Sequence, residues 1–161
     1  MRDKFLSLVM ISQLMSCAST PDFDTTQVNR ALTPQSVIAE PESSRDKIAL
    51  WGGTILDTRN MKDMTQIEVL AYPLSSSHRP LLESKPLGRF LIQHKGYLEA
   101  TSYAQGRQLT VLGSVSGSQT GKVGDSTYNY PVISSTQLHL WSQSDEPRNR
   151  TSFHFGVGVG L

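Results

Sequence analysis

The sequence predicts an all-β fold, a small antiparallel barrel or sandwich over residues 47–161, which follows an export signal and a tether. Apolar and polar residues alternate with a period of two in several stretches, the pattern of half-buried strands. Turn-forming residues separate these stretches, and no segment has a sustained helical period. With 161 residues, 37% of them hydrophobic, the chain can build one small core.

The strands are expected in order along this domain. In residues 65–72, Ile67, Val69 and Ala71 share one face, and the other face holds Gln66, Glu68, Leu70 and Tyr72. The Gly52–Gly53 pair predicts a bulge or sharp bend in the first strand. Six or seven short strands are therefore expected, and the alternation is clearest in residues 48–56, 65–72, 90–93, 109–115, 138–141 and 153–159.

Residues 1–16 have the layout of a bacterial signal peptide. Arg2 and Lys4 make the start of the chain basic, and an apolar stretch from Phe5 to Met15 follows. This stretch is too short to span a bilayer as a helix. The sequence therefore predicts export from the cytoplasm by a cleavable segment.

Cys17, the only cysteine of the chain, follows the signal peptide directly. Leu14 and Ser16 precede it as in the lipobox of bacterial lipoproteins. A cysteine thiolate can form a stable thioether with a diacylglyceryl group, and acyl chains hold a protein at a membrane. By the enterobacterial sorting rule that this resemblance brings, Ala18 and Ser19 in place of Asp direct the protein to the outer membrane. The alternatives are a buried helix with an incidental thiol and a secreted or uncleaved chain.

Residues 17–46 are expected to form the lipidated end and a flexible linker. This segment is rich in Pro, Ser and Thr, and its apolar residues follow neither a helical nor a strand period. As a flexible coil, about 30 residues would span roughly 30 Å, so the domain could stand off its membrane. The alternative is a short helix over residues 33–38, with Thr33 as the cap and Pro34 in the first turn.

The composition argues against nucleic acid as a partner and against several kinds of catalysis. Fifteen basic and fourteen acidic side chains give a net charge of +1, which provides no basic groove. Gly113–Gly117 has Val115 where a serine nucleophile would stand, and the glycine-rich run after it lacks the spacing of a phosphate loop. The four histidines have no metal-binding spacing. No catalytic residue, metal site or cofactor is therefore predicted. A hydrolase is the remaining alternative, and it would need a cleft that holds two nearby carboxylates or a Ser–His pair.

The order of several short motifs resembles the Slp-type outer-membrane lipoproteins, small starvation-inducible envelope proteins of Gram-negative bacteria. No single motif is specific, but together they cover nearly the whole chain. The motifs lie at Leu14–Cys17, Leu32–Pro34, Trp51–Ile55, Asn60, Thr65–Leu70, Tyr72–Leu74, Gly88–Phe90, Gly96–Glu99, Tyr103, Gly106–Arg107, Thr110–Gly113, Gly124, Tyr128–Ile133 and Leu138–Trp141.

The resemblance implies a lipid-anchored outer-membrane protein whose domain faces the periplasm, with a small β-barrel of OB-like type. It implies a non-enzymatic role in envelope structure, stress tolerance or interaction with an envelope partner. The alternative is a binding module for a small ligand or a glycan. Its candidate ligand face consists of Trp51, Arg89, Arg107, Tyr128 and Tyr130, for whose aromatic members packing is the simpler interpretation.

Overall fold

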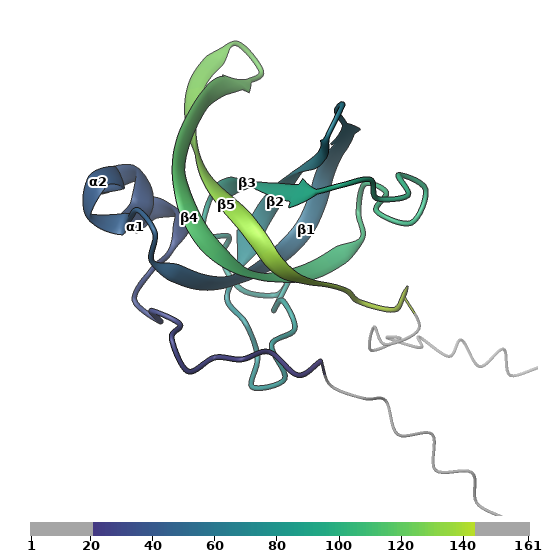
Figure 1. The fold of residues 1–161 in the computed structure, drawn as a ribbon, viewed down its shortest axis with the longest axis horizontal. Coiled ribbons are helices and arrows are strands. Elements are labelled where there is room, and N and C mark those ends of the chain that lie inside the picture. Colours follow the sequence, from purple (N-terminus) through teal and green to yellow (C-terminus); the bar gives the residue numbers. More distant parts are fainter. Residues whose placement is uncertain (1–20, 144–161) are drawn as a thin grey trace, which may run out of the picture.

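A computed structural model describes residues 21–143 of the chain, which form a β-barrel with two short helices at its side (Figure 1). The predicted signal peptide, Cys17 and the strand expected at residues 153–159 lie outside the described residues. Within the described part, no helix is long and apolar enough to cross a membrane. The elements are α1 (Pro34–Ala39), α2 (Pro41–Ser44), β1 (Ile48–Asn60), β2 (Met64–Tyr72), β3 (Arg89–Lys95), β4 (Gln108–Val123) and β5 (Ser126–Leu140).

The five strands close into a barrel in the order β1-β2-β3-β5-β4, and β4 pairs with β1 to complete the circle. The pairs are antiparallel except for β3 and β5, which run parallel over Leu91–Gln93 and Val132–Ser134. Closure pairs each strand on both sides within the barrel wall, which protects these stretches from pairing with other chains, whereas the outer part of the β4–β5 hairpin pairs only within itself. The prediction of a small all-β barrel is confirmed.

The interior of the barrel holds the apolar residues that the alternation selects. In β2, Ile67, Val69 and Ala71 are buried and the residues between them are partly exposed, as predicted. The larger buried cluster consists of Val37, Ala49, Trp51, Ile55, Ile67, Val69, Ala71, Phe90, Ile92, Leu109, Val111, Val115 and Ile133.

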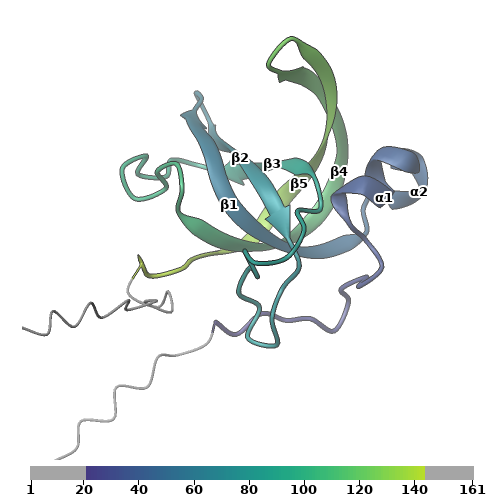
Figure 2. The same cartoon turned by 180° about the vertical axis from the view of Figure 1, so that it is seen from behind.

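Five of the six stretches expected as strands fall on the five strands of the described residues, but β4 and β5 are much longer than expected. β4 runs over 16 residues through Gly113 and Gly117. The pairing of β4 with β5 shifts register at both glycines, so the strand bends there without ending. The β4–β5 hairpin consequently curves away from the barrel beyond its upper rim in the figures (Figure 2).

The bulge predicted at Gly52–Gly53 lies a few residues later in β1. The register of β1 against β2 shifts between Ile55 and Asp57, and pairing continues without a break through both glycines. A Cβ atom at Gly53 would collide with the backbone carbonyl of Leu70, so glycine is needed there for close approach of two strands.

The segment before β1 differs from the expected flexible linker, because much of it packs on the barrel. Thr33 caps α1 through its side chain, which accepts a hydrogen bond from the Ser36 backbone N–H at 3.1 Å, and Pro34 occupies the first turn. The short-helix alternative is thus confirmed. Val37 of α1 is fully buried in the barrel core, and Phe23 is buried as well.

Candidate functional site

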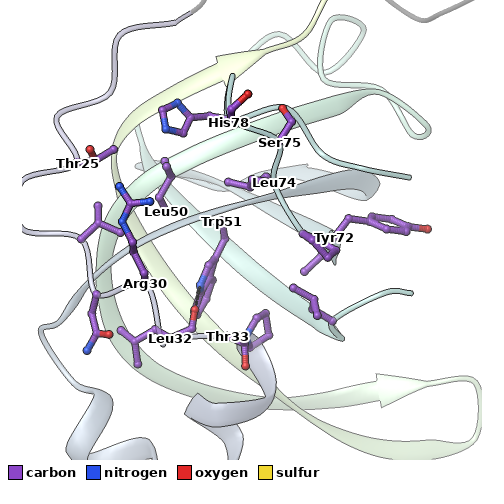
Figure 3. A pocket seen from close by; sticks show the side chains of 17 residues that line it. Thr25, Arg30, Leu32, Thr33, Leu50, Trp51, Tyr72, Leu74, Ser75 and His78 are labelled. Atoms are coloured by element: carbon purple, nitrogen blue, oxygen red, sulfur yellow. Dashed lines mark hydrogen bonds between the residues drawn. The ribbon is translucent and has the colours of Figure 1, made fainter. Parts of the chain in front are cut away.

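A cleft of about 490 Å³ lies between the N-terminal segment and the loop that follows β2 (Figure 3). One wall is formed by residues 25–34 and the other by residues 71–78 together with Leu87. Four leucines, two prolines and Trp51 give the lining a predominantly apolar character, and Arg30 and His78 are its basic members. Such a lining suits an apolar or amphipathic occupant better than a highly charged one.

Trp51 forms the wall of the cleft on the barrel side. Its indole ring packs edge-on against Phe90, with centroids 5.1 Å apart, and its Nε1 donates a hydrogen bond to the Leu32 carbonyl oxygen at 2.9 Å. The side chain is only 5% exposed. Trp51 is therefore a core residue that also fixes the N-terminal segment, and little of its ring is available to stack on a ligand.

His78 lies on the opposite side of the cleft in a backbone conformation with φ of 65°. Its carbonyl oxygen accepts a hydrogen bond from the Thr110 hydroxyl at 2.7 Å, which ties the loop to β4. The imidazole meets the Phe23 ring edge-on at 5.7 Å. Its Nδ1 atom is buried and has no hydrogen-bond partner among the described residues. The loop is thus held between the barrel and the N-terminal segment.

A second group of polar side chains gathers on the outer surface of the barrel around Glu68 of β2. The Arg89 guanidinium donates to Glu68 Oε1 at 2.7 Å, and the Tyr130 hydroxyl donates to the same oxygen at 3.1 Å. The Tyr128 hydroxyl accepts from the Arg89 backbone N–H at 3.0 Å, and its ring lies 4.7 Å from that of Tyr130. The group closes the space under the bent β4–β5 hairpin next to Leu91.

Burial of Tyr130 raises the pKa of its phenol above the ordinary value of about 10, and the Glu68 carboxylate raises it further. The hydrogen bond to Glu68 likewise raises the pKa of Arg89. Arg89 and Tyr130 both donate hydrogen bonds to the Glu68 carboxylate, so the cluster resembles a structural polar network. The adjoining hollow is small, about 120 Å³.

The five residues of the candidate ligand face do not share one surface. Arg89, Tyr128 and Tyr130 come together, but Trp51 faces the interior of the barrel. Arg107 lies apart and donates to the carbonyl oxygens of Ser102 and Trp141. Arg89 of β3 lies near Tyr128 and Tyr130 of β5 because these two strands are neighbours in the barrel. The order of the strands could not be predicted from the sequence alone.

One pairing that sequence reasoning missed joins Ser135 of β5 to His94 of β3. Their Oγ and Nδ1 atoms are 2.8 Å apart, although 41 residues separate them in the sequence. A serine and a histidine in contact are the minimum for nucleophilic catalysis, but neither lines a cleft described above. Among residues 21–143, no three His, Cys, Asp or Glu side chains gather in a way that could hold a metal ion.

The fold defines a small closed β-barrel domain into which the N-terminal segment is built. Residues 14–157 match the Outer membrane lipoprotein Slp family. The chain therefore belongs to the Slp family of outer-membrane lipoproteins, and this membership places it at the outer membrane. The suspected family resemblance is confirmed.

Three curated proteins are similar to this chain, and one of them carries the family's name. An uncharacterized protein of Haemophilus influenzae is 32% identical over 71% of this chain and 60% of its own length. The uncharacterized lipoprotein YeaY of Escherichia coli is 28% identical over 80% of this chain and 66% of its own. The outer membrane protein Slp of E. coli is 29% identical over 58% and 49%, respectively. The matched part of the chain thus spans about half to two thirds of the relatives.

One solved structure is similar in part, the Schizosaccharomyces pombe Pot1pC protein bound to single-stranded DNA. The match covers 74% of this chain and 88% of that chain, at 10% identity and a TM-score of 0.32. At that score, the similarity carries no argument about fold or ligand.

Proposed function

We propose that this chain is held at the outer membrane by acyl chains on Cys17 and serves there as a non-enzymatic structural or interaction protein of the cell envelope. Membership of the outer-membrane lipoprotein family supports the anchor, as do the apolar stretch and the lone cysteine at its end. The acyl chains supply the membrane affinity, because each buried CH₂ contributes about 0.8 kcal/mol. The domain supplies the surface that acts in the periplasm.

The observation that carries the interaction role is the packing of the N-terminal segment on the barrel. Gln137 donates a side-chain hydrogen bond to the Asp22 carbonyl oxygen at 2.7 Å, and Phe23 is buried. The domain therefore begins about five residues after Cys17 rather than at the end of a long flexible tether. A barrel held so near the bilayer suits a role at the membrane surface.

A non-enzymatic role is supported by the state of the polar clusters. Glu68, Arg89 and Tyr130 form hydrogen bonds among themselves, and the cleft beside Trp51 has a mainly apolar lining. Starvation or stress tolerance is the setting that the family resemblance implies. The proposed contribution is mechanical or adhesive, through contacts of the barrel with another envelope component.

The proposal is tested by fractionation of the full chain in a Gram-negative host. Cys17→Ala is expected to leave an uncleaved precursor that no longer fractionates with the outer membrane. The matched variant Ala18→Asp keeps the lipid site and changes only the sorting position, so it is expected to be lipidated and retained at the inner membrane. Outer-membrane fractionation of Cys17→Ala at the wild-type level would overturn the proposed anchor.

A further inference from the structure

The end of the barrel that follows β2 holds both the N-terminal segment and the loop of residues 73–87. In the figures, this end lies low in the view, opposite the turn between β1 and β2. The Phe23 ring contacts His78 of the loop, and Asp22 is fixed to β5 through Gln137. The path of the chain is therefore set from residue 22 onward.

The length of chain before this point limits the distance to the membrane. Cys17 is six residues before Phe23, and an extended chain covers at most about 3.3–3.6 Å per residue, so Cys17 lies within roughly 20 Å of Phe23. If Cys17 carries the acyl chains, as proposed above, the bilayer surface is no farther than this from the loop that Phe23 contacts.

Four large apolar side chains are exposed among the described residues, those of Met61, Leu81, Leu82 and Tyr97. Met61 lies in the turn before β2, and the backbone before Tyr97 is joined to the same turn, because the Gly96 N–H donates to the Asp63 carbonyl oxygen. Leu81 and Leu82 lie in the loop after β2. The nine residues of β2 separate the two ends by roughly 30 Å at about 3.3 Å per residue.

The leucine pair is held in place by the backbone. The Leu81 N–H donates to the Pro73 carbonyl oxygen at 2.8 Å, and the Ser84 N–H donates to the Leu81 carbonyl oxygen at 3.0 Å. Leu82 remains 39% exposed and Leu81 42% exposed. The two leucines therefore form a small, fixed apolar patch on the surface of the loop.

We propose that the loop of residues 73–87 is the membrane-facing surface of the domain, and that Leu81 and Leu82 insert into the interfacial region of the phospholipid bilayer. This inference rests on the proposed lipid anchor at Cys17, which brings the bilayer within reach of this loop. Glu83 and Lys85 follow the leucines and offset each other in charge. The contact is therefore mainly apolar, and we expect it to change little with salt or with the content of anionic lipid.

The test uses the mature lipoprotein reconstituted into vesicles. Because lipidation converts the sulfur of Cys17 to a thioether, Leu82→Cys introduces the only free thiol of the chain. An environment-sensitive fluorophore is attached there, and the vesicles contain phosphatidylethanolamine, phosphatidylglycerol and phosphatidylcholine brominated on its acyl chains. Met61→Cys is the matched control, since Met61 is exposed to a similar degree, 49%, at the other end of β2.

The proposal predicts a blue-shifted emission and quenching by the brominated lipid at position 82, both retained in high salt, and neither effect at position 61. Equal quenching at both positions, quenching only at position 61, or none at either would overturn the proposed orientation. The intact mass of the same samples separates this from failure of the anchor. A lipidated protein without quenching at position 82 contradicts the orientation alone, whereas an unlipidated protein contradicts the anchor and the orientation with it.

Discussion

The indole Nε1 of Trp51 in β1 donates a hydrogen bond to the backbone carbonyl oxygen of Leu32, 19 residues earlier in the chain, at 2.9 Å. This bond joins the barrel core to the segment that leads toward Cys17. Together with the buried Val37 and Phe23, it makes the N-terminal segment part of the domain. The position of the barrel relative to the anchor proposed at Cys17 therefore depends on this packing, and several substitutions test that dependence.

Trp51→Phe is expected to loosen the N-terminal segment. The change removes the bond to Leu32 and leaves space beside Phe90, and we expect the free energy of unfolding to fall by about 1–3 kcal/mol. Trypsin cleavage after the exposed Arg30 should accelerate in folded protein. Trp141→Phe is the control, because the Trp141 indole donates to Thr110 and not to the segment. Equal cleavage rates in the two variants would contradict the view that the Trp51 hydrogen bond to Leu32 holds the N-terminal segment on the barrel.

Val37→Ala tests whether α1 belongs to the folded core. Val37 is fully buried, and its truncation should lower the free energy of unfolding by about 1–3 kcal/mol in urea denaturation. Gln35→Ala, at an exposed position of the same helix, should change stability by less than about 0.5 kcal/mol. If Val37→Ala were as stable as Gln35→Ala, α1 would not be part of the cooperative unit.

Gly53→Ala should be severely destabilising. The added Cβ would overlap the Leu70 carbonyl of the neighbouring strand, and a backbone group in a paired strand cannot move aside easily. We expect a loss of more than about 3 kcal/mol, or failure to fold. Gly124→Asn is the comparison, because Gly124 has φ of 59°, open space around it and a conformation that asparagine tolerates. A Gly53→Ala protein with wild-type thermal stability would contradict the close approach of β1 and β2.

The pKa shift of Tyr130 predicts a dependence of stability on alkaline pH. Its pKa is raised in the folded state, so the folded protein holds the phenol proton more tightly than the unfolded chain does. The resulting stabilisation is fully present below the ordinary pKa of about 10 and is lost as the pH rises through the folded value.

In Tyr130→Phe this titration is absent. The variant should be less stable than the wild type at neutral pH by about 1 kcal/mol, because the hydrogen bond that the phenol donates to Glu68 is lost. The difference should narrow above about pH 10. Urea denaturation across the alkaline range measures it, and a difference that stays constant from neutral pH upward would contradict the assignment.

The sequence was a good guide to the fold where one physical effect dominates. Burial of alternate residues in β2 follows directly from a period of two, and Ile67 and Val69 are buried as expected. The length of β4 could not be predicted, because Gly113 and Gly117 can end a strand or bend it, and the outcome depends on the partner strand. Apolar residues in the N-terminal segment gave no period, because Phe23 and Val37 are buried by tertiary contacts and not along a regular face.

The candidate site was harder to predict than the fold. Aromatic residues such as Trp51 and Tyr130 suit either packing or ligand binding, and only their neighbours in the fold decide between these roles. The pair of His94 and Ser135 shows the same limit, since a parallel contact of β3 with β5 joins distant parts of the chain. The cleft could not be predicted from the sequence, because one of its walls is the segment expected to be a flexible linker.

The most direct test of the proposed role is the intact mass of the native protein extracted from membranes in detergent. A mature chain that begins at Cys17 and carries a diacylglyceryl group and an amide-linked acyl chain is the predicted result. A full-length or unlipidated mass would contradict the account, because the barrel would then have no anchor at Cys17 to hold it at the outer membrane.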